Sequence, residues 1–325
     1  MPVPPPRILP FSPEGVVEAA QAIAAGEPVA VATETVYGLA ADATRGEAVA
    51  RIYAAKGRPQ FNPLIVHVPD LAAVEALAEF DGDARALAAA FWPGPLTLVL
   101  PLRARAGVAS LVTAGLPTVA VRVPAGRAMR ALLEATGKPL AAPSANRSGH
   151  LSPTRAEHVA GSLGDAIPLI LDDGPTPAGL ESTIVGGRTI LRPGPITAER
   201  ITTTLCSRAG GSPAEVAELD SRLRGSTGEG KITSPGQLLS HYAPSKPVRL
   251  DATAAAPDEW HIGFGPVAGD DNLSARGDLT EAAAHLFDAL HRADAATKPR
   301  IAVAPIPCDG IGEAINDRLR RAAHA

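Results

Sequence analysis

The segment AAKGRPQFNPLIVH, residues 54–67, carries the residue types that indicate both the fold and the kind of site in this chain. Lys56 and Arg58 flank a glycine, and two prolines stiffen the chain just before an apolar run of strand length. Two cations held close together at low entropic cost are suited to binding an anion such as a phosphate. Taken alone, such a pair is more often a solvated helix end, so other residues must converge on it.

Composition limits the possible classes of protein. The chain has 325 residues, of which 46% are hydrophobic, enough for one large domain or two ordinary ones with a sizeable core. Its net charge of −4 argues against bulk attraction to nucleic acid or to an anionic membrane. No run of 18 apolar residues occurs, and the two cysteines form no zinc motif. We therefore expect a soluble, cytoplasmic protein without a structural metal, in which Cys206 and Cys308 are small buried hydrophobes.

Apolar runs of strand length alternate with alanine-rich helical segments from residue 28 to about residue 205, a pattern typical of mixed α/β structure. The expected strands are PVAVATETVYGL, PLIVHV, LTLVLP, TVAVRV, PLAAPS, PLILDD and ESTIVG. Residues 206–246 are rich in Gly, Ser and Pro and predict an interdomain linker. Beyond it, residues 247–325 predict a small second α/β domain, with one helix starting at Thr280. We expect the first domain to cover residues 1–205.

Alternation along three of these strands predicts a shared polar face. His67 lies opposite the apolar face of its strand, and Arg122 does so in TVAVRVP. In VATETVYG, Thr33, Thr35 and Tyr37 are expected to share one side. If these strands belong to one sheet, the open face is a cationic floor for a small zwitterion or anion. An ordinary solvated sheet face is the alternative.

Two loops add groups that bind phosphate. APSANRSG, residues 142–149, offers Ser144 and Asn146, and LRPG places Arg192 before a turn. A capped turn is the alternative for the first loop, because Ser, Asn and Pro favour turns. Ser144 lacks the GxSxG context of a hydrolase nucleophile.

Two other segments partly resemble nucleotide-binding motifs. GSTGEGK, residues 225–231, has Walker A spacing, but Ile232 occupies the position of the magnesium-binding Ser or Thr and no apolar strand precedes it. We interpret it as part of the linker. HIGFGPVAG, residues 261–269, has the wrong glycine spacing for a dinucleotide loop and contains a proline.

Seven motifs occur in the order found in the YrdC family, and they cover residues 15–205: TETVYGLAADA, KGRPQFNPLIVHV, WPGPLTLVL, TVAVRVP, PLAAPSANRSG, DGPTPAGLESTIV and ILRPG. The chain resembles the two-domain form of this family, the threonylcarbamoyl-AMP synthases. The resemblance implies a twisted mixed sheet with flanking helices and a concave open face, followed by a small C-terminal Rossmann-like domain. It further implies synthesis of L-threonylcarbamoyl-AMP from L-threonine, bicarbonate and ATP, with Mg²⁺ arriving with ATP.

The same resemblance implies roles for individual residues. The set expected to hold threonine is Thr35, His67, Arg122, Ala142 and Ser182. The set expected to hold ATP is Lys56, Arg58, Asn62, Thr118, Ser144, Asn146, Ser152, Arg192 and Tyr242. The reactive-site signatures within it are Lys56, Arg58, Ser144 and Asn146. Arg122 would pair with the threonine carboxylate, as suits a guanidinium fork.

The resemblance also implies a downstream partner, a transferase that uses the product to modify tRNA next to the anticodon, so that tRNA is met only indirectly or weakly. The linker motif SPGQLLSHYAP departs from the family at Gln237 and Leu239, but it keeps His241 and Tyr242 as a candidate lid. Two rival functions remain: a double-stranded RNA binding protein of the same fold, against which the net charge argues, and a carbamoyl transferase accessory module.

Overall fold

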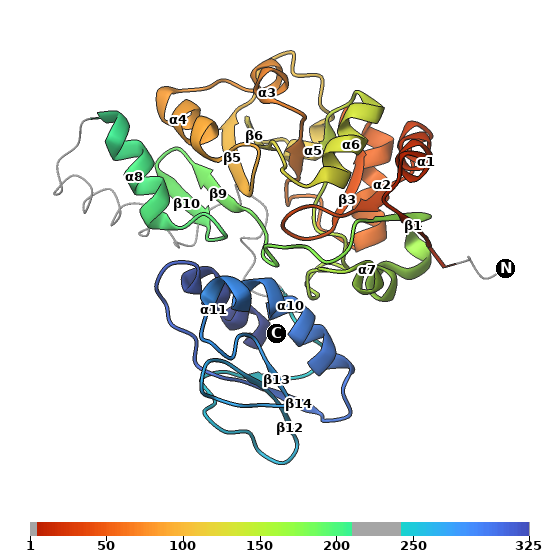
Figure 1. Ribbon diagram of the computed structural model, residues 1–325. Helices are drawn as coiled ribbons and strands as arrows, with labels where there is room; N and C mark the ends of the chain where they lie inside the picture. The colour runs from red at the N-terminus through yellow and green to blue at the C-terminus, as the bar shows by residue number, and fades with distance from the viewer. Residues whose placement is uncertain (1–4, 210–241, 325) are drawn as a thin grey trace.

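The computed structural model describes residues 5–209 and 242–324, which form two α/β domains (Figure 1). The N-terminal domain is built on a ten-stranded mixed sheet with the order β1-β8-β2-β3-β7-β4-β6-β5-β9-β10. Its strands are β1 (Arg7–Pro10), β2 (Val29–Val31), β3 (Gly38–Asp42), β4 (Ile65–His67), β5 (Leu96–Pro101), β6 (Thr118–Arg122), β7 (Leu140–Ala141), β8 (Leu169–Asp172), β9 (Thr183–Gly186) and β10 (Thr189–Arg192). This sheet confirms the predicted α/β class, although the sequence patterns missed the edge strands β1 and β10.

Helices flank this sheet. They are α1 (Pro13–Ala24), α2 (Gly46–Lys56), α3 (Leu71–Leu77), α4 (Gly82–Phe91), α5 (Ser110–Thr113), α6 (Arg127–Thr136), α7 (Ala156–Leu163), the 3-10 turn η1 (Gly164–Ala166) and α8 (Ala198–Ala209). The start of α1 is fixed by Ser12, whose side chain accepts a hydrogen bond from the Gly15 amide. Helix α8 packs against α4, so this layer continues past residue 205, where we had expected the linker to begin.

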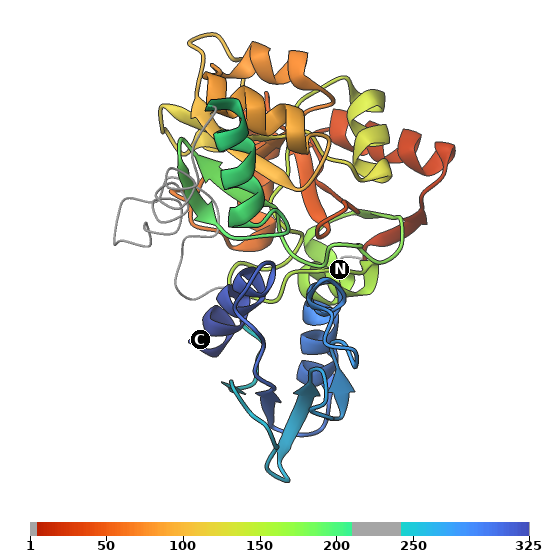
Figure 2. The ribbon, with the colours of Figure 1, turned by 60° about the vertical axis from the view of Figure 1, so that its left-hand side comes forward.

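The C-terminal domain has a four-stranded parallel sheet with the order β11-β14-β12-β13. Its elements are β11 (Val248–Arg249), β12 (Glu259–Gly263), β13 (Asp271–Asn272), α10 (Leu279–Ala295), β14 (Arg300–Val303) and α11 (Gly312–Ala323). In both ribbon views, α10 and α11 lie between this sheet and the N-terminal domain (Figures 1 and 2). Helix α10 begins after Asp278, whose carboxylate accepts from the amides of Thr280 and Glu281, so Asp278 and not Thr280 is its cap.

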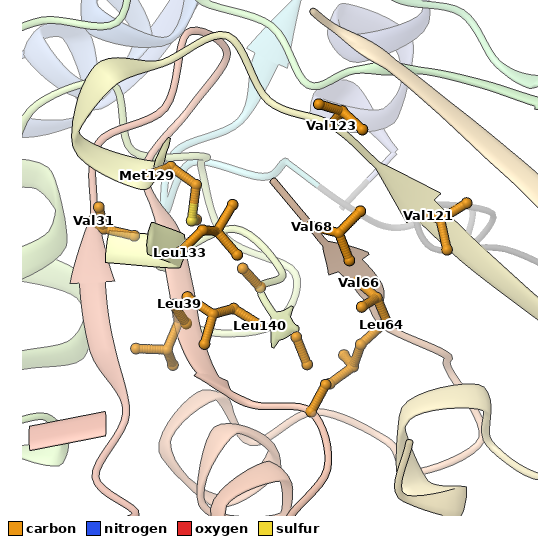
Figure 3. Packing of buried hydrophobic residues seen from close by; sticks show 14 of the residues in the cluster. Val31, Leu39, Leu64, Val66, Val68, Val121, Val123, Met129, Leu133 and Leu140 are labelled. Carbon is orange, nitrogen blue, oxygen red and sulfur yellow. The ribbon is translucent and has the colours of Figure 1, made fainter. Parts of the chain in front are cut away.

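The apolar faces of β4 and β6 form the centre of the N-terminal core. Figure 3 shows Val66 and Val68 beside Val121 and Val123, with Leu140 close by. Each fully buried side chain of this kind stabilises the fold by roughly 1.5–3 kcal/mol. A one-residue slip would turn these side chains to the other face, so burial fixes the register and keeps the opposite faces of both strands for other uses.

The predicted strand across residues 28–39 is interrupted. Strand β2 ends at Val31, β3 begins at Gly38 and the two pair antiparallel, so residues 32–37 form a loop. The Tyr37 hydroxyl donates to Asp172 Oδ1 at 2.5 Å and to the Gly174 carbonyl at 2.8 Å, whereas Thr33 and Thr35 line a pocket. The expectation that all three side chains share one side of a strand was therefore wrong, because a loop does not alternate like a strand.

Several other expectations are decided by the fold or fall outside it. HIGFGPVAG contributes the end of β12 and a turn closed by a bridge between Phe264 and Val267, and it leads to β13 and not to a helix. Cys206 is buried but Cys308 is exposed, so the prediction of two buried cysteines was wrong for Cys308. Within residues 5–209 and 242–324, no helix is long and apolar enough to span a membrane. GSTGEGK, Gln237, Leu239, His241 and most of the predicted linker lie outside the described residues.

Candidate functional site

A pocket forms in the N-terminal domain where the loop after β2, the ends of β4 and β6, and the segments around β7, β9 and β10 converge. Its lining residues are Thr33, Thr35, Val36, Gly38, Arg58, Ile65, His67, Arg122, Ala142, Pro143, Ser144, Glu181, Ser182, Arg192 and Tyr242. All five residues of the predicted threonine set are among them. From the predicted ATP set, the pocket contains Arg58, Ser144, Arg192 and Tyr242.

Arg122 is held rigidly at the end of β6. Its Nη1 donates to Thr35 Oγ1 at 2.9 Å, its Nη2 to Glu34 Oε1 at 2.5 Å and its Nε to the Gly94 carbonyl at 3.2 Å. Glu34 in turn accepts from the Gly126 amide at 3.0 Å. A guanidinium has five N–H donors, so two remain for a ligand carboxylate. Burial alone would raise the pKa of Glu34, but the charge of Arg122 outweighs it and lowers the pKa to about 2.

His67 pairs with Arg122 in the register of the parallel strands β4 and β6. Its side chain is 3% exposed and its Nδ1 has no hydrogen-bond partner among the described residues. Burial, followed by the positive charge of Arg122, lowers the pKa of His67 to about 3. The imidazole is therefore neutral, and it offers a buried ring nitrogen to whatever enters the pocket.

Arg58 reaches the pocket because α2 ends at Lys56. Gly57 takes the left-handed conformation (φ 58°) that closes a helix and reverses the chain. The Arg58 guanidinium then donates to the carbonyls of Asn62 and Pro63, at 3.2 and 3.0 Å. Burial lowers its pKa to about 10, still far above neutral pH. The KGR segment is thus the end of a helix, as the alternative interpretation of this motif predicts. Lys56 and Arg58 are nevertheless buried and not exposed to solvent.

Lys56 does not line the pocket, and its ammonium is used inside the protein. Its Nζ donates to the Ser144 carbonyl at 2.6 Å and to the Asn146 carbonyl in a shorter contact, and Asn146 Oδ1 lies 3.4 Å away. Burial, and then the charge of Arg58, lowers the pKa of Lys56 well below its usual range. Lys56 therefore fixes the loop that presents Ser144 to the pocket.

The other predicted residues outside the pocket lining have structural contacts of their own or lie further away. Asn146 Nδ2 donates to the carbonyls of Arg147 and His150, at 3.0 and 2.7 Å, which closes the loop. The Ser152 hydroxyl donates to Glu181. Both polar side-chain atoms of Asn62 are buried and have no partner within the described residues. Thr118 lies at the start of β6, away from the pocket end of that strand.

Ser182 and Arg192 form another part of the pocket wall. Arg192 donates from Nε and Nη2 to the Ser182 carbonyl at 3.1 and 2.9 Å, and the Ser182 hydroxyl shares a 2.7 Å hydrogen bond with Thr97. Burial lowers the pKa of Arg192. Neither Arg58 nor Arg192 forms an ion pair with a carboxylate among residues 5–209 and 242–324, so the pocket contains two buried cations that an anion can neutralise.

The sequence patterns missed two acidic residues, Glu34 and Glu181. Each adjoins a predicted residue, Thr35 or Ser182, but no cation lies next to either in the sequence, so no local pattern marked them as counter-charges. Tyr242 was predicted to cover the nucleotide. It is 1% exposed, lines the pocket and packs 5.7 Å from the Phe287 ring of the C-terminal domain.

Two family models match the chain. The one described as "Telomere recombination" matches residues 21–194, and the one described as "Threonylcarbamoyl-AMP synthase, C-terminal domain" matches residues 196–324. The threonylcarbamoyl-AMP synthase of Bacillus subtilis (strain 168) is 39% identical over 334 residues, which cover 95% of this chain and 92% of that protein. That of Pyrococcus abyssi (strain GE5 / Orsay) is 38% identical and covers 94% of this chain and 93% of the relative.

The fold agrees with these matches. The crystal structure of Sua5 from P. abyssi in complex with L-threonine superposes with a TM-score of 0.84 at 34% identity, covering 98% of each chain. The two family matches, the long relatives and this superposition confirm the resemblance drawn from the seven motifs. The chain belongs to the two-domain, Sua5-type threonylcarbamoyl-AMP synthases.

Proposed function

We propose that the pocket holds L-threonine beside ATP and joins them with bicarbonate to give L-threonylcarbamoyl-AMP and diphosphate. The observation that carries this proposal is the placement of the paired His67 and Arg122 in one pocket with the buried cations Arg58 and Arg192. The L-threonine bound to the P. abyssi protein supports the amino acid half of the assignment.

The reaction needs no nucleophile from the protein. The threonine nitrogen bonds to the carbon of bicarbonate with loss of water and gives a carbamate. A carbamate oxygen then attacks the α-phosphorus of ATP, and the bond to diphosphate breaks. The protein has to position the substrates and to stabilise negative charge that builds up on the phosphates.

The pocket residues suit these two tasks. The two N–H groups that Arg122 retains would receive the threonine carboxylate, and His67 would accept or donate one hydrogen bond through Nδ1. Arg58 and Arg192 would face the phosphates, where removal of one preorganised donor commonly costs on the order of 10²–10³ in rate. Because both guanidiniums are already fixed by backbone carbonyls, little reorganisation is needed when charge develops.

The same arrangement suggests roles for the residues outside the pocket lining. Lys56 and Asn146 would act through the loop that they hold, and Ser144 and Ser152 would contact ATP directly or through that loop. Mg²⁺ would enter with the phosphates of ATP, which are its usual partners together with water. We further propose that the product passes to a transferase that modifies tRNA next to the anticodon, and that both proteins act in the cytoplasm.

The test is product analysis by liquid chromatography with mass detection, using ATP, L-threonine and ¹³C-bicarbonate. We expect one labelled carbon in threonylcarbamoyl-AMP, and we expect diphosphate release to stop when threonine or bicarbonate is left out. Diphosphate release that continues without threonine and without bicarbonate would overturn the proposal. Salt-sensitive binding of double-stranded RNA without turnover would favour the rival function instead.

A further inference from the structure

One side chain of the C-terminal domain reaches the wall of the pocket in the N-terminal domain. Arg318, on α11, is 0% exposed and is among the largest fully buried side chains of the described residues. Its Nε donates to Glu181 Oε2 at 2.8 Å, and its Nη2 donates to the Pro193 carbonyl at 3.0 Å. Its guanidinium carbon lies 5.0 Å from the centre of the Tyr242 ring. Arg318 thus contacts three separate segments that bear pocket residues.

The contact with Glu181 extends into the predicted ATP site. Glu181 lines the pocket, and its second carboxylate oxygen accepts from the Ser152 hydroxyl. Burial alone would raise the pKa of Glu181, but the charges of Arg318 and then Arg192 outweigh it and lower the pKa. With Arg318 in place, Glu181 stays ionised and can orient Ser152. Without it, a buried carboxylate would lose its nearest counter-charge and tend to take up a proton.

The contact with Pro193 fixes the segment that carries Arg192. This segment packs tightly against the one that carries Glu181: a Cβ added to Gly194 would lie 2.5 Å from the Thr183 nitrogen and 2.7 Å from the Glu181 carbonyl oxygen. Such close backbone contact leaves no room for independent movement of the two segments. Arg318 therefore links both of them to α11 as one unit.

The third contact involves Tyr242. Its ring contacts both the Arg318 guanidinium and the Phe287 ring of α10, and its backbone has φ 69°, a left-handed conformation that a tyrosine adopts only when its surroundings impose it. The Tyr242 side chain thus lines the pocket while side chains of α10 and α11 hold it in place.

We propose that Arg318 is a positioning residue for the ATP half of the site, so that the C-terminal domain completes the nucleotide pocket of the N-terminal domain. This inference rests on the proposed function. Within the described residues, the hydrogen bonds of Arg318 do not involve Thr35, His67 or Arg122, although Ser182 of the threonine set adjoins Glu181. Loss of Arg318 therefore weakens the binding of ATP more than that of threonine.

The experiment compares Arg318→Gln with Arg320→Gln, a control on the exposed side of the same helix. For Arg318→Gln we expect the KM for ATP to rise on the order of 10- to 100-fold, as follows from losing hydrogen bonds to a charged group. The Kd for L-threonine, measured by calorimetry without ATP, stays within about twofold and shows that the variant is folded. Arg320→Gln leaves both constants unchanged.

Two further variants make the comparison robust. Arg318→Lys keeps the charge but has one donor nitrogen in place of the three nitrogens of the guanidinium. Its KM for ATP therefore falls between those of the wild type and Arg318→Gln. Glu181→Gln combined with Arg318→Gln costs less than the sum of the two single changes if they act through one contact.

Equal weakening of threonine and ATP binding, or an unchanged KM for ATP in Arg318→Gln, would overturn the inference while wild-type turnover continues. Absence of product from the wild type would instead refute the proposed function itself. If Arg318→Gln does not fold, the same comparison is made with Arg318→Lys and Glu181→Gln, and the same two results count against the inference.

Discussion

His67 and Arg122 are register partners on the adjacent parallel strands β4 and β6, and both side chains lie in the same pocket. Arg122 is fixed by Glu34 and Thr35, whereas His67 Nδ1 has no hydrogen-bond partner in the part of the chain that the structure describes. The pair therefore presents one fixed positive charge and one neutral hydrogen-bonding group to the same small ligand.

Replacing Arg122 by Gln should weaken threonine binding without a comparable effect on ATP. The change removes the donors that we assign to the threonine carboxylate, so the Kd for threonine should rise roughly 10- to 100-fold in calorimetric titrations. Arg127→Gln is the matched control, because Arg127 is exposed and pairs with Asp173 at the surface. Equal loss of affinity for threonine and ATP would contradict this assignment.

Lys56→Met should destabilise the protein as well as reduce turnover. The change leaves the buried contact to the Asn146 carbonyl without its donor, at a cost of roughly 1–3 kcal/mol in the free energy of unfolding. Urea denaturation measures this cost. Lys138→Met, at an exposed lysine, should stay within about 0.5 kcal/mol of the wild type. A fully stable Lys56→Met protein would show that the ammonium serves only the ligand.

Acidification should weaken the fold through His291 on α10. Its ring stacks on His158 of α7 at 3.8 Å between ring centres, and its Nε2 donates to the Ser152 carbonyl at 3.1 Å. Burial, and then the charge of His158, lowers the pKa of His291 to about 4. Because the unfolded pKa is about 6.5, the unfolded state binds more protons between these values, and stability falls as pH drops below about 6.5.

The size of this effect is roughly 2 kcal/mol at pH 5, taken from the two pKa values. Urea unfolding at pH 7.5 and pH 5 measures it, with His291→Gln as the comparison because glutamine does not titrate. The variant should lose less stability than the wild type on going to pH 5. An identical loss in both proteins would exclude His291 as the source.

Gly179→Ala should disturb the contact between the two domains. Gly179 has φ 65°, and a Cβ there would lie 2.3 Å from the Ala283 carbonyl oxygen and 2.5 Å from the Ala284 Cα, both on α10. Gly187 has φ 58° but open space around it, so Gly187→Ala carries only the conformational cost of about 1–2 kcal/mol. We expect Gly179→Ala to lower the melting temperature clearly more than Gly187→Ala. Equal melting temperatures would mean that the domains separate easily at this point.

Local patterns predicted much of the fold and part of the site. Alternation placed Val66 and Val121 in the core and His67 and Arg122 on the other face, because side-chain direction along a strand depends only on position. The same rule failed for Tyr37, since nothing in VATETVYG marks the loop that interrupts the strand. The KGR motif, and not alternation, assigned Lys56 and Arg58 to one site, although only Arg58 lines the pocket.

The sequence by itself determined the α/β class, the family through seven ordered motifs, and the polar face shared by β4 and β6. Only the tertiary structure decided that Glu34 neutralises part of the charge of Arg122, that Lys56 donates to carbonyls of the loop that carries Ser144, and that Arg318 reaches Glu181. The physical reason is that the state of a buried charge depends on its nearest partner in space. These partners lie 88, 90 and 137 positions apart in the chain, beyond the reach of any local pattern.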